Sequence, residues 1–378
     1  MKLAEAIRSA GLKWVPVLSF HQCGGNVGDE CAIPIPAWLW KKYPDAMTVS
    51  EFGNPTKETL TPWSTRDVLP EYMAVMRSFK NTFAAHASNI AEINISFGPS
   101  GELRFPSYNS HDQGKANCPT RGGLQAYGVL ARESFRKYVI QKYGSLQRIN
   151  GAWNTALTDP SQVNVPSDTN IFYGAQRRQS AYNRDLYSWY HASLLEHGRL
   201  LGEAALAEFG GADSPMKGVY LGAKVPGIHW RMASDRLAEL NAGLITVNTQ
   251  DAPSSRDYSD IVGLFRSLDE KAKTRGSRFV FHFTCLEMSD HENGEVAASL
   301  AKTLVKIVGQ AALEQNVLIK GENALSTTLS TQQSWDNMKE PIFNGPYKGI
   351  TILRFDDILK SDVASRNFKE MVDAASKK

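Results

Sequence analysis

Two glutamates follow short apolar stretches of the chain, and their positions suggest paired acid–base chemistry. Residues 317–319 predict a buried strand that runs through a glycine to Glu322. Residues 93–97 lead in the same way through glycines to Glu102. Two carboxyls with well-separated pKa values can protonate a leaving oxygen and activate a water molecule. We therefore predict a catalytic pair in which Glu102 is the general acid and Glu322 the complementary carboxylate.

Each glutamate also has a purely structural alternative. Glu102 could form an ion pair with Arg104 in its loop, and Glu322 could pair with Lys320 two residues earlier. The aromatic and proline residues around Glu102 would remove it from water and raise its pKa, which favours the acid role. In such a pair, the distance between the two carboxyls decides the configuration at the carbon whose bond is cleaved. A distance of about 6.5–9.5 Å is expected for inversion and about 5–5.5 Å for retention.

Further polar residues stand just beyond other apolar stretches. Lys224 and His229 follow residues 218–223, and they are expected to donate hydrogen bonds to sugar hydroxyls unless they are ordinary loop residues. Thr284 follows residues 277–283. Arg354 follows residues 349–353, with pairing to Asp356 or Asp357 as its alternative.

A glycine-rich loop at residues 23–28 lies between His21 and Asp29. Such a loop suits a lid over a site, and an aspartate on a lid could bond substrate hydroxyls. Asp29 could equally cap a turn. The loop is followed by prolines instead of a helix, so it does not predict a nucleotide site.

The pattern of elements predicts an α/β protein with a parallel sheet. Its strands are short apolar runs without alternation, as in sheets that are buried on both faces. We expect six of them, at residues 14–20, 90–97, 218–223, 277–283, 316–320 and 349–353. Helices are expected at residues 1–11, 36–43, 65–88, 127–150, 185–209, 234–242, 257–276, 295–312, 332–338 and 362–376, and a short strand at 245–248. Residues 44–64 and 151–178 are expected to be loops, and residues 1–378 a single domain.

Composition narrows the classes of function. The net charge is +3 without a basic cluster, so no nucleic-acid partner is expected, and no apolar run is long enough for a membrane span. The four cysteines lack a zinc-binding spacing and are interpreted as buried or incidental thiols. His229, His282 and Glu287 share no helix and no standard ligand spacing, so neither a catalytic metal nor a cofactor is expected.

Taken together, several blocks of the sequence resemble the β-amylase family, the inverting exo-hydrolases of starch. The blocks are SFHQCGGNVGD at 19–29, GPSGELRFPSY at 98–108, GIHW at 227–230, FTCLEM at 283–288, GENAL at 321–325 and ILR at 352–354. The stretch from Lys142 to Leu146 is closer to bacterial than to plant members. The resemblance implies a (β/α)8 TIM-type barrel with long loops at its C-terminal face. It also implies hydrolysis of α-1,4-glucosidic bonds from non-reducing ends, with release of β-maltose.

The resemblance also assigns roles to single residues. It makes Glu102 the general acid and Glu322 the general base. Asp29 would belong to a flexible lid, Thr284 to an inner loop, and Leu325 would wedge between glucosyl rings, while Tyr108 lines the pocket. Sugar contacts are implied for His21, Lys224, His229, Asn323 and Arg354.

One departure from the family concerns the number of strands. The family has two further strands before residue 14, so the six visible strands correspond to strands three to eight and cannot close a barrel. We therefore expect either upstream sequence or an incomplete barrel, and a catalytically impaired glucan-binding or regulatory protein is the alternative function. A calcium site and a starch-binding domain are not expected, and the protein is expected to be a monomer. Its location is expected to be extracellular if the N-terminus is truncated and the protein is bacterial, and otherwise cytoplasmic.

Overall fold

A sheet of six parallel strands forms the centre of the molecule. The computed structural model describes residues 2–24, 31–112, 115–116, 118–174, 180–247, 252–292, 294–325 and 327–377. The strands of the sheet are β1 Val17–Leu18, β4 Glu92–Ile95, β5 Tyr220–Val225, β6 Phe279–Phe283, β7 Ile319–Glu322 and β8 Ile350–Thr351. They lie in this order across the sheet, and each neighbouring pair is parallel. All six predicted strands are confirmed.

The sheet is buried on both of its faces, which explains the unbroken apolar runs in the sequence. Every residue of β4 and of β6 is buried. The sheet is curled, and within the described residues β1 and β8 each pair with one neighbour only. It is therefore an open part of a TIM-type barrel, as six strands led us to expect.

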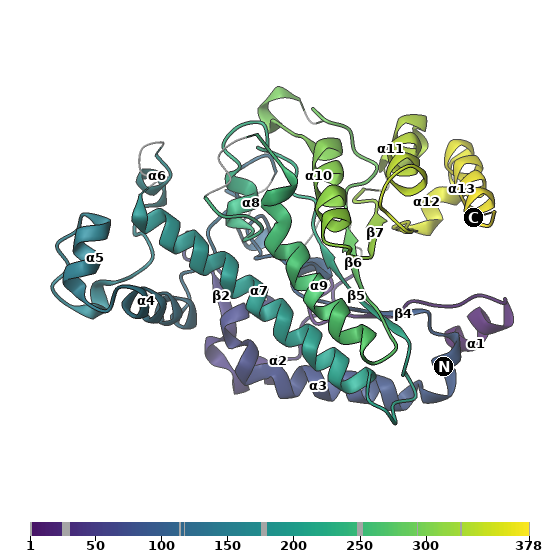
Figure 1. The fold of residues 1–378 in the computed structure, drawn as a ribbon, viewed down its shortest axis with the longest axis horizontal. Helices are drawn as coiled ribbons and strands as arrows, with labels where there is room; N and C mark the ends of the chain where they lie inside the picture. The colour runs from purple at the N-terminus through teal and green to yellow at the C-terminus, as the bar shows by residue number, and fades with distance from the viewer. Residues whose placement is uncertain are drawn as a thin grey trace.

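Helices connect the strands and cover the outside of the sheet (Figure 1). The covering helices are α3 Thr65–Thr82, α7 Ala181–Phe209, α9 Ser259–Lys273, α10 Ala301–Glu314, α11 Gln332–Phe343 and α13 Asp362–Ala375. Shorter helices are α1 Lys2–Ser9, α2 Ala37–Lys42, α8 Leu237–Asn241 and α12 Phe355–Leu359. A group formed by α4 Val129–Tyr143, α5 Leu146–Trp153 and α6 Thr169–Phe172 lies at one end of α7, away from the sheet (Figure 1).

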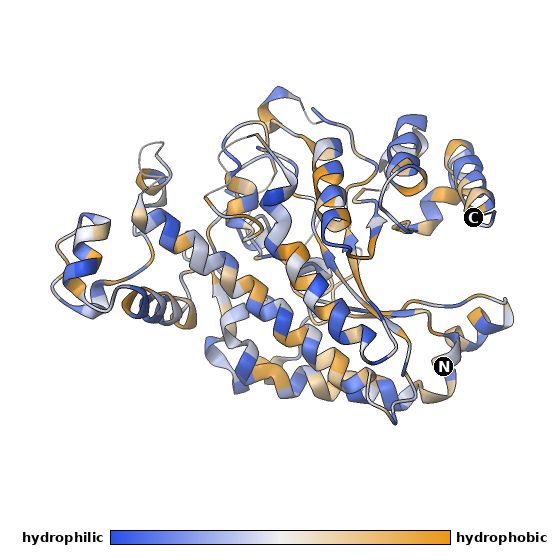
Figure 2. Ribbon diagram, in the orientation of Figure 1, coloured by the Kyte–Doolittle hydropathy of each residue, from blue (hydrophilic) through white to orange (hydrophobic). Residues whose placement is uncertain are grey.

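Hydrophobic and hydrophilic residues alternate along α7 and α9 (Figure 2). On α9, Ile261, Leu264, Phe265 and Leu268 are buried. Within the described residues no helix is both long and apolar enough to cross a membrane.

Several predicted elements differ in the structure, and one is the loop predicted over 151–178, which contains the short helix α6. Residues 44–64 contain an antiparallel hairpin, β2 Met47–Val49 and β3 Pro55–Leu60, instead of a loop. The helix predicted over 127–150 is divided into α4 and α5, because Gly144 takes a left-handed conformation with φ 75° that ends the first helix. No strand forms at 245–247, where the apolar residues are buried as irregular chain, and Asn248 lies outside the described residues.

Two of the four cysteines form a disulfide, so interpreting all of them as incidental thiols was wrong. Cys23 and Cys31 are bonded with their Cα atoms 5.5 Å apart. An antiparallel bridge between Cys23 and Ile33 brings the two chain segments together. Cys118 and Cys285 are free.

The contact between α7 and α9 depends on a glycine, which gives a first prediction. A Cβ atom on Gly202 would lie 2.5 Å from Cδ1 of the buried Leu268. We predict that Gly202→Ala lowers the free energy of unfolding by about 1–3 kcal/mol through overpacking. Alanine is the better helix former, so propensity alone would give the opposite sign. Urea unfolding of the purified variant measures the change.

Gly151 in α5 is the matched control, because a Cβ atom there would meet nothing within 4 Å. Gly151→Ala should raise the free energy of unfolding by about 0.5–1 kcal/mol. Equal effects of the two substitutions would contradict close packing at Gly202.

Candidate active site

The loop that carries Glu102 is a tight turn directly after β4. The amide of Gly101 donates to the carbonyl of Gly98 at 3.0 Å, and the amide of Glu102 donates to that of Pro99 at 3.0 Å. Gly101 has φ 82°, a conformation that side chains rarely adopt. The turn brings Glu102 alongside Lys224 in a parallel bridge, and the amide of Leu103 donates to the carbonyl of Lys224 at 2.8 Å.

The surroundings of Glu102 favour its protonated form. Burial raises the pKa of this carboxyl, and the negative charge of Glu322 raises it further. The charge and hydrogen bond of Arg104, together with Lys224, oppose this rise without cancelling it. Arg104 Nε donates to Glu102 Oε2 at 2.8 Å, so the predicted pairing of these two residues is present beside the raised pKa. A buried carboxyl of this kind can act as a general acid.

Glu322 lies at the end of β7, and its side chain is 6% exposed. Lys224 Nζ from β5 lies 2.5 Å from Glu322 Oε2, as a close ion pair without the angles of an aligned hydrogen bond. The alternative in which Lys320 pairs with Glu322 is wrong, because Lys320 Nζ instead contacts Glu92 Oε2 at 2.6 Å. Lys224 thus contacts one of the predicted catalytic carboxyls, and its charge also acts on the other.

Other predicted residues surround this pair. His21 Nδ1 is 2.8 Å from the hydroxyl of Ser96, and the ring passes over Gly101 next to Glu102. The ring of Tyr108 lies under the guanidinium of Arg104, with 4.2 Å between the charge and the ring centre. It also meets the ring of Trp230 edge to face at 5.0 Å.

The loops after β5 and β6 pack against each other. The Thr284 hydroxyl accepts a hydrogen bond from the amide of Gly227 at 2.8 Å. His229 Nδ1 lies 2.7 Å from the hydroxyl of Ser299, and burial lowers the pKa of His229 to about 4. A neutral imidazole at ordinary pH can still donate a hydrogen bond to a sugar hydroxyl.

The remaining predicted residues follow β7 and β8. Asn323 is fully buried; its Oδ1 accepts from the amide of Leu353 at 2.6 Å and its Nδ2 donates to the carbonyl of Leu325. Leu325 is half-buried against the core. Arg354 begins α12 with φ 60°. Asp29 lies outside the described residues. The sugar contacts of these residues stay predictions.

Glu287 holds the loop after β7, a role that the sequence did not predict. Its carboxylate accepts from the amide of Ala324 at 3.0 Å and from that of Leu325 at 2.7 Å. The other two residues once weighed as metal ligands also have protein partners, because His282 bonds Glu92 and His229 bonds Ser299. A carboxyl four residues past a strand carries no sequence signal for bonds to a distant turn.

The hairpin supplies a second unpredicted group near the acid. Glu58 on β3 is 3% exposed, and its carboxylate accepts from Asn109 Nδ2. Asn109 Oδ1 in turn accepts from Arg104 at 2.7 Å. The charge of Glu58 acts on Arg104, so the guanidinium beside Glu102 stays balanced when that acid is neutral.

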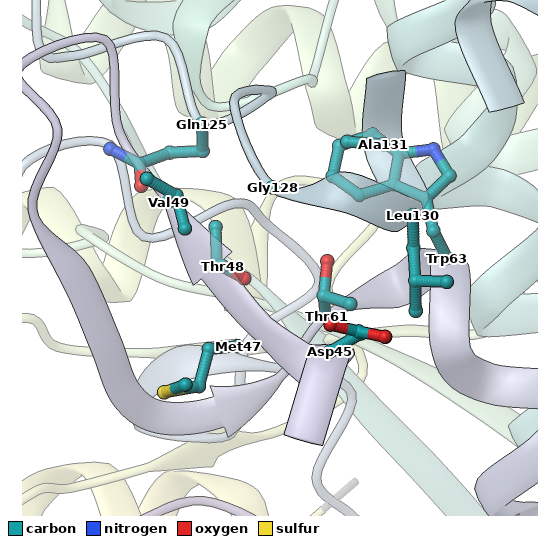
Figure 3. Close-up of a pocket in the computed structure, with 10 residues that line it drawn as sticks. All are labelled: Asp45, Met47, Thr48, Val49, Thr61, Trp63, Gln125, Gly128, Leu130 and Ala131. Atoms are coloured by element: carbon teal, nitrogen blue, oxygen red, sulfur yellow. The ribbon is translucent and has the colours of Figure 1, made fainter. Parts of the chain in front are cut away.

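Two hollows are present in the described structure. One lies between the hairpin and the chain around Trp63 and Leu130 and has no room for a water molecule (Figure 3). The other, of about 250 Å³, lies between α10 and α11. Neither is lined by Glu102, Lys224 or Glu322.

A TIM-type sheet with two carboxyls and a lysine at its strand ends is an arrangement suited to acid–base chemistry. Residues 1–377 match glycosyl hydrolase family 14, and the chain belongs to this family.

Named relatives agree with this assignment. The chain is 39% identical to a β-amylase of Cytobacillus firmus over 95% of its own length and 71% of the relative's. It is 34% identical to a β-amylase of Bacillus cereus, over 98% of this chain and 63% of the relative. It is 39% identical to a beta/alpha-amylase of Paenibacillus polymyxa, over 95% of this chain and 28% of that protein. The chain thus spans less than two thirds of two of these three relatives.

A solved structure has the same fold. The catalytic domain of β-amylase from Paenibacillus polymyxa superposes with a TM-score of 0.82 at 37% sequence identity. The match covers 100% of this chain and 85% of that domain.

Glu287 gives a prediction about stability and pH. Burial raises the pKa of Glu287 from 4.5 to about 7, although the amides of Leu325 and Ala324 oppose the rise. The folded protein therefore keeps a proton that the unfolded chain loses, so stability falls as pH rises between these two values. The fall is on the order of 3 kcal/mol, and it should be absent in Glu287→Gln, whose side chain does not titrate.

Unfolding free energies of wild type and Glu287→Gln at pH 4.5 and pH 8 measure this effect. Other titrating groups contribute equally to both proteins, so the difference between their unfolding free energies reports on Glu287 alone. A difference that stays constant with pH would show that this carboxyl titrates normally.

Proposed function

We propose that this chain hydrolyses α-1,4-glucosidic bonds of starch-like polysaccharides from their non-reducing ends and releases β-maltose with inversion. The observation that carries the proposal is the pairing of Glu102, a buried carboxyl with raised pKa, with Glu322, a carboxylate held by Lys224. Membership of glycosyl hydrolase family 14 and the β-amylase names of the relatives support it.

The proposed reaction moves two protons in one displacement. Glu102 gives its proton to the glycosidic oxygen as that oxygen leaves the anomeric carbon. Glu322 takes a proton from a water molecule whose oxygen bonds the anomeric carbon from the opposite face. The negative charge therefore passes from Glu322 to Glu102, and the total charge of the pair does not change.

Lys224 and Arg104 are placed for this transfer of charge. Lys224 pairs with Glu322 and also lowers the pKa of Glu102. It can therefore stabilise whichever carboxyl is ionised. Arg104 donates to Glu102 Oε2 and would stabilise the carboxylate that forms after proton donation.

The sugar-binding residues of the proposal are those that the family resemblance assigned. They are His21, Asp29, Tyr108, Lys224, His229, Thr284, Asn323, Leu325 and Arg354. Starch, maltodextrin and maltose are the proposed ligands, and a monomer is the proposed state.

The open sheet favours one alternative function. Strands β1 and β8 border the sheet on two sides within the described residues. A site that is open at these edges could hold a glucan without excluding water well enough for turnover. In that case the protein would be a glucan-binding or regulatory relative.

Substitution of the two carboxyls tests the reaction. Glu102→Gln and Glu322→Gln should each lower maltose release from soluble starch by about 10²–10⁴-fold or more. With α-maltosyl fluoride, whose leaving group needs no proton, Glu102→Gln should regain activity and Glu322→Gln should not. Proton NMR of the first product should show the β-anomer.

Glu203→Gln is the control, because Glu203 forms exposed ion pairs with Arg199 and Lys271 on the outer helices and should not affect turnover. Absence of maltose release by the wild type at high concentration would refute the proposed activity. Calorimetric binding of maltose in that experiment would support the glucan-binding alternative.

A further inference from the structure

Three basic side chains lie in one row across the inner face of the sheet. In the strand register Lys224 of β5 is paired with His282 of β6, and His282 with Lys320 of β7. Directly paired residues of neighbouring strands point to the same face. Glu322 follows Lys320 by two residues on the same strand, so it points to this face as well.

Glu92 binds two members of this row. This glutamate begins β4 and is 1% exposed. Its Oε1 lies 2.5 Å from His282 Nε2, and its Oε2 accepts from Lys320 Nζ at 2.6 Å. Burial opposes its ionisation, but the hydrogen bond from His282 and the charge of Lys320 outweigh burial and lower the pKa of Glu92. The lysine that is nearest to Glu322 along the chain is thus paired with another carboxylate.

Gly222 provides the space that this contact requires. It lies on β5, between the strands that carry Glu92 and His282. A Cβ atom on Gly222 would lie 2.5 Å from Glu92 Oε1 and 3.1 Å from His282 Cδ2. The side chain of Glu92 therefore crosses β5 where that strand has no side chain.

We propose that Glu92 is a positioning residue for the base: it holds Lys320 and His282, so that Lys320 does not join Lys224 on Glu322. The inference rests on the proposed function, because it concerns the base of that reaction. A second cation on Glu322 would favour its ionised form and weaken it as a base. Glu92 thereby maintains the basicity of Glu322 without touching substrate.

The charged and titratable groups around Glu322 come from several elements. They are Lys224 on β5, Glu102 and Arg104 after β4, His282 on β6, Cys285 and Glu287 after β6, Lys320 on β7 and Arg354 after β8. Within the described residues, Glu92 binds two members of this set, Lys320 and His282, and so holds both away from Glu322. A change at Glu92 therefore has a definite sign.

Three variants test the proposal through the pH dependence of kcat/KM for maltose release. Glu92→Gln leaves Lys320 uncompensated, so the acidic limb of the pH profile of kcat/KM should move down by about 1 pH unit. The value of kcat should fall, with KM little changed. Lys320→Met leaves Glu92 uncompensated, so the limb should move up. The double variant restores the charge balance and should return the limb to its wild-type position.

A merely structural role would not give shifts of opposite sign that cancel. The matched control is Asp269→Asn, which removes a buried carboxylate paired with Arg278 and Lys273 next to the first residue of β6. It should lower stability without moving the limb. The proposal is overturned if Glu92→Gln leaves the limb in place, or if the double variant does not restore it.

A second measurement separates this proposal from the proposed function. In protein with ¹³C-labelled glutamate carboxyls, the Glu322 resonance can be assigned by its loss in Glu322→Gln. Its pH titration should move down in Glu92→Gln and up in Lys320→Met, whether or not the wild type releases maltose. Absence of turnover would refute the proposed function alone, and an unchanged Glu322 titration would refute the role of Glu92 alone.

Discussion

The site depends on the close approach of two backbones, at Glu102 in the loop after β4 and at Lys224 near the end of β5. They form a parallel bridge, and the carbonyl of Lys224 accepts from the amide of Leu103. This contact fixes the acid beside the lysine. The lysine then spans β6 to reach Glu322 on β7. One backbone contact thus connects the acid to a lysine that pairs with the second carboxyl, which is far away in sequence.

A parallel sheet that is buried on both faces imposes a second constraint, because a charge on its inner face must find an opposite charge. The inner face satisfies this condition with separate pairs. Lys224 pairs with Glu322, and Glu92 takes Lys320 and His282. The acid is treated differently, since burial favours its neutral form while Glu58 balances its neighbour Arg104. The protonation and pairing of the charged side chains in the site therefore depend on residues from several strands of the inner face.

The six strands could be predicted because short apolar runs are a local signal. The positions of Glu102 and Glu322 at strand ends could be predicted because two of these runs lead through glycine to a carboxylate. The ion-pair partner of Glu322 could not be predicted in this way. Lys320 is nearer in sequence, but register and the presence of Glu92 decide the pairing. The hairpin at 47–60 was missed because its strands carry polar residues among few apolar ones. The Cys23–Cys31 bond depends on a backbone bridge that no cysteine spacing indicates.

The groups after β7 are held in a different way from Glu322 itself. Glu322 belongs to the strand and is fixed by sheet hydrogen bonds and by Lys224. The turn that follows is fixed by the Glu287 carboxylate, which accepts from two backbone amides, and by Asn323, which accepts from Leu353. Burial raises the pKa of Glu287 to about 7, so the charge of this carboxyl changes near neutral pH. The turn that carries Leu325 and the strand that carries the base are therefore held by different carboxyls.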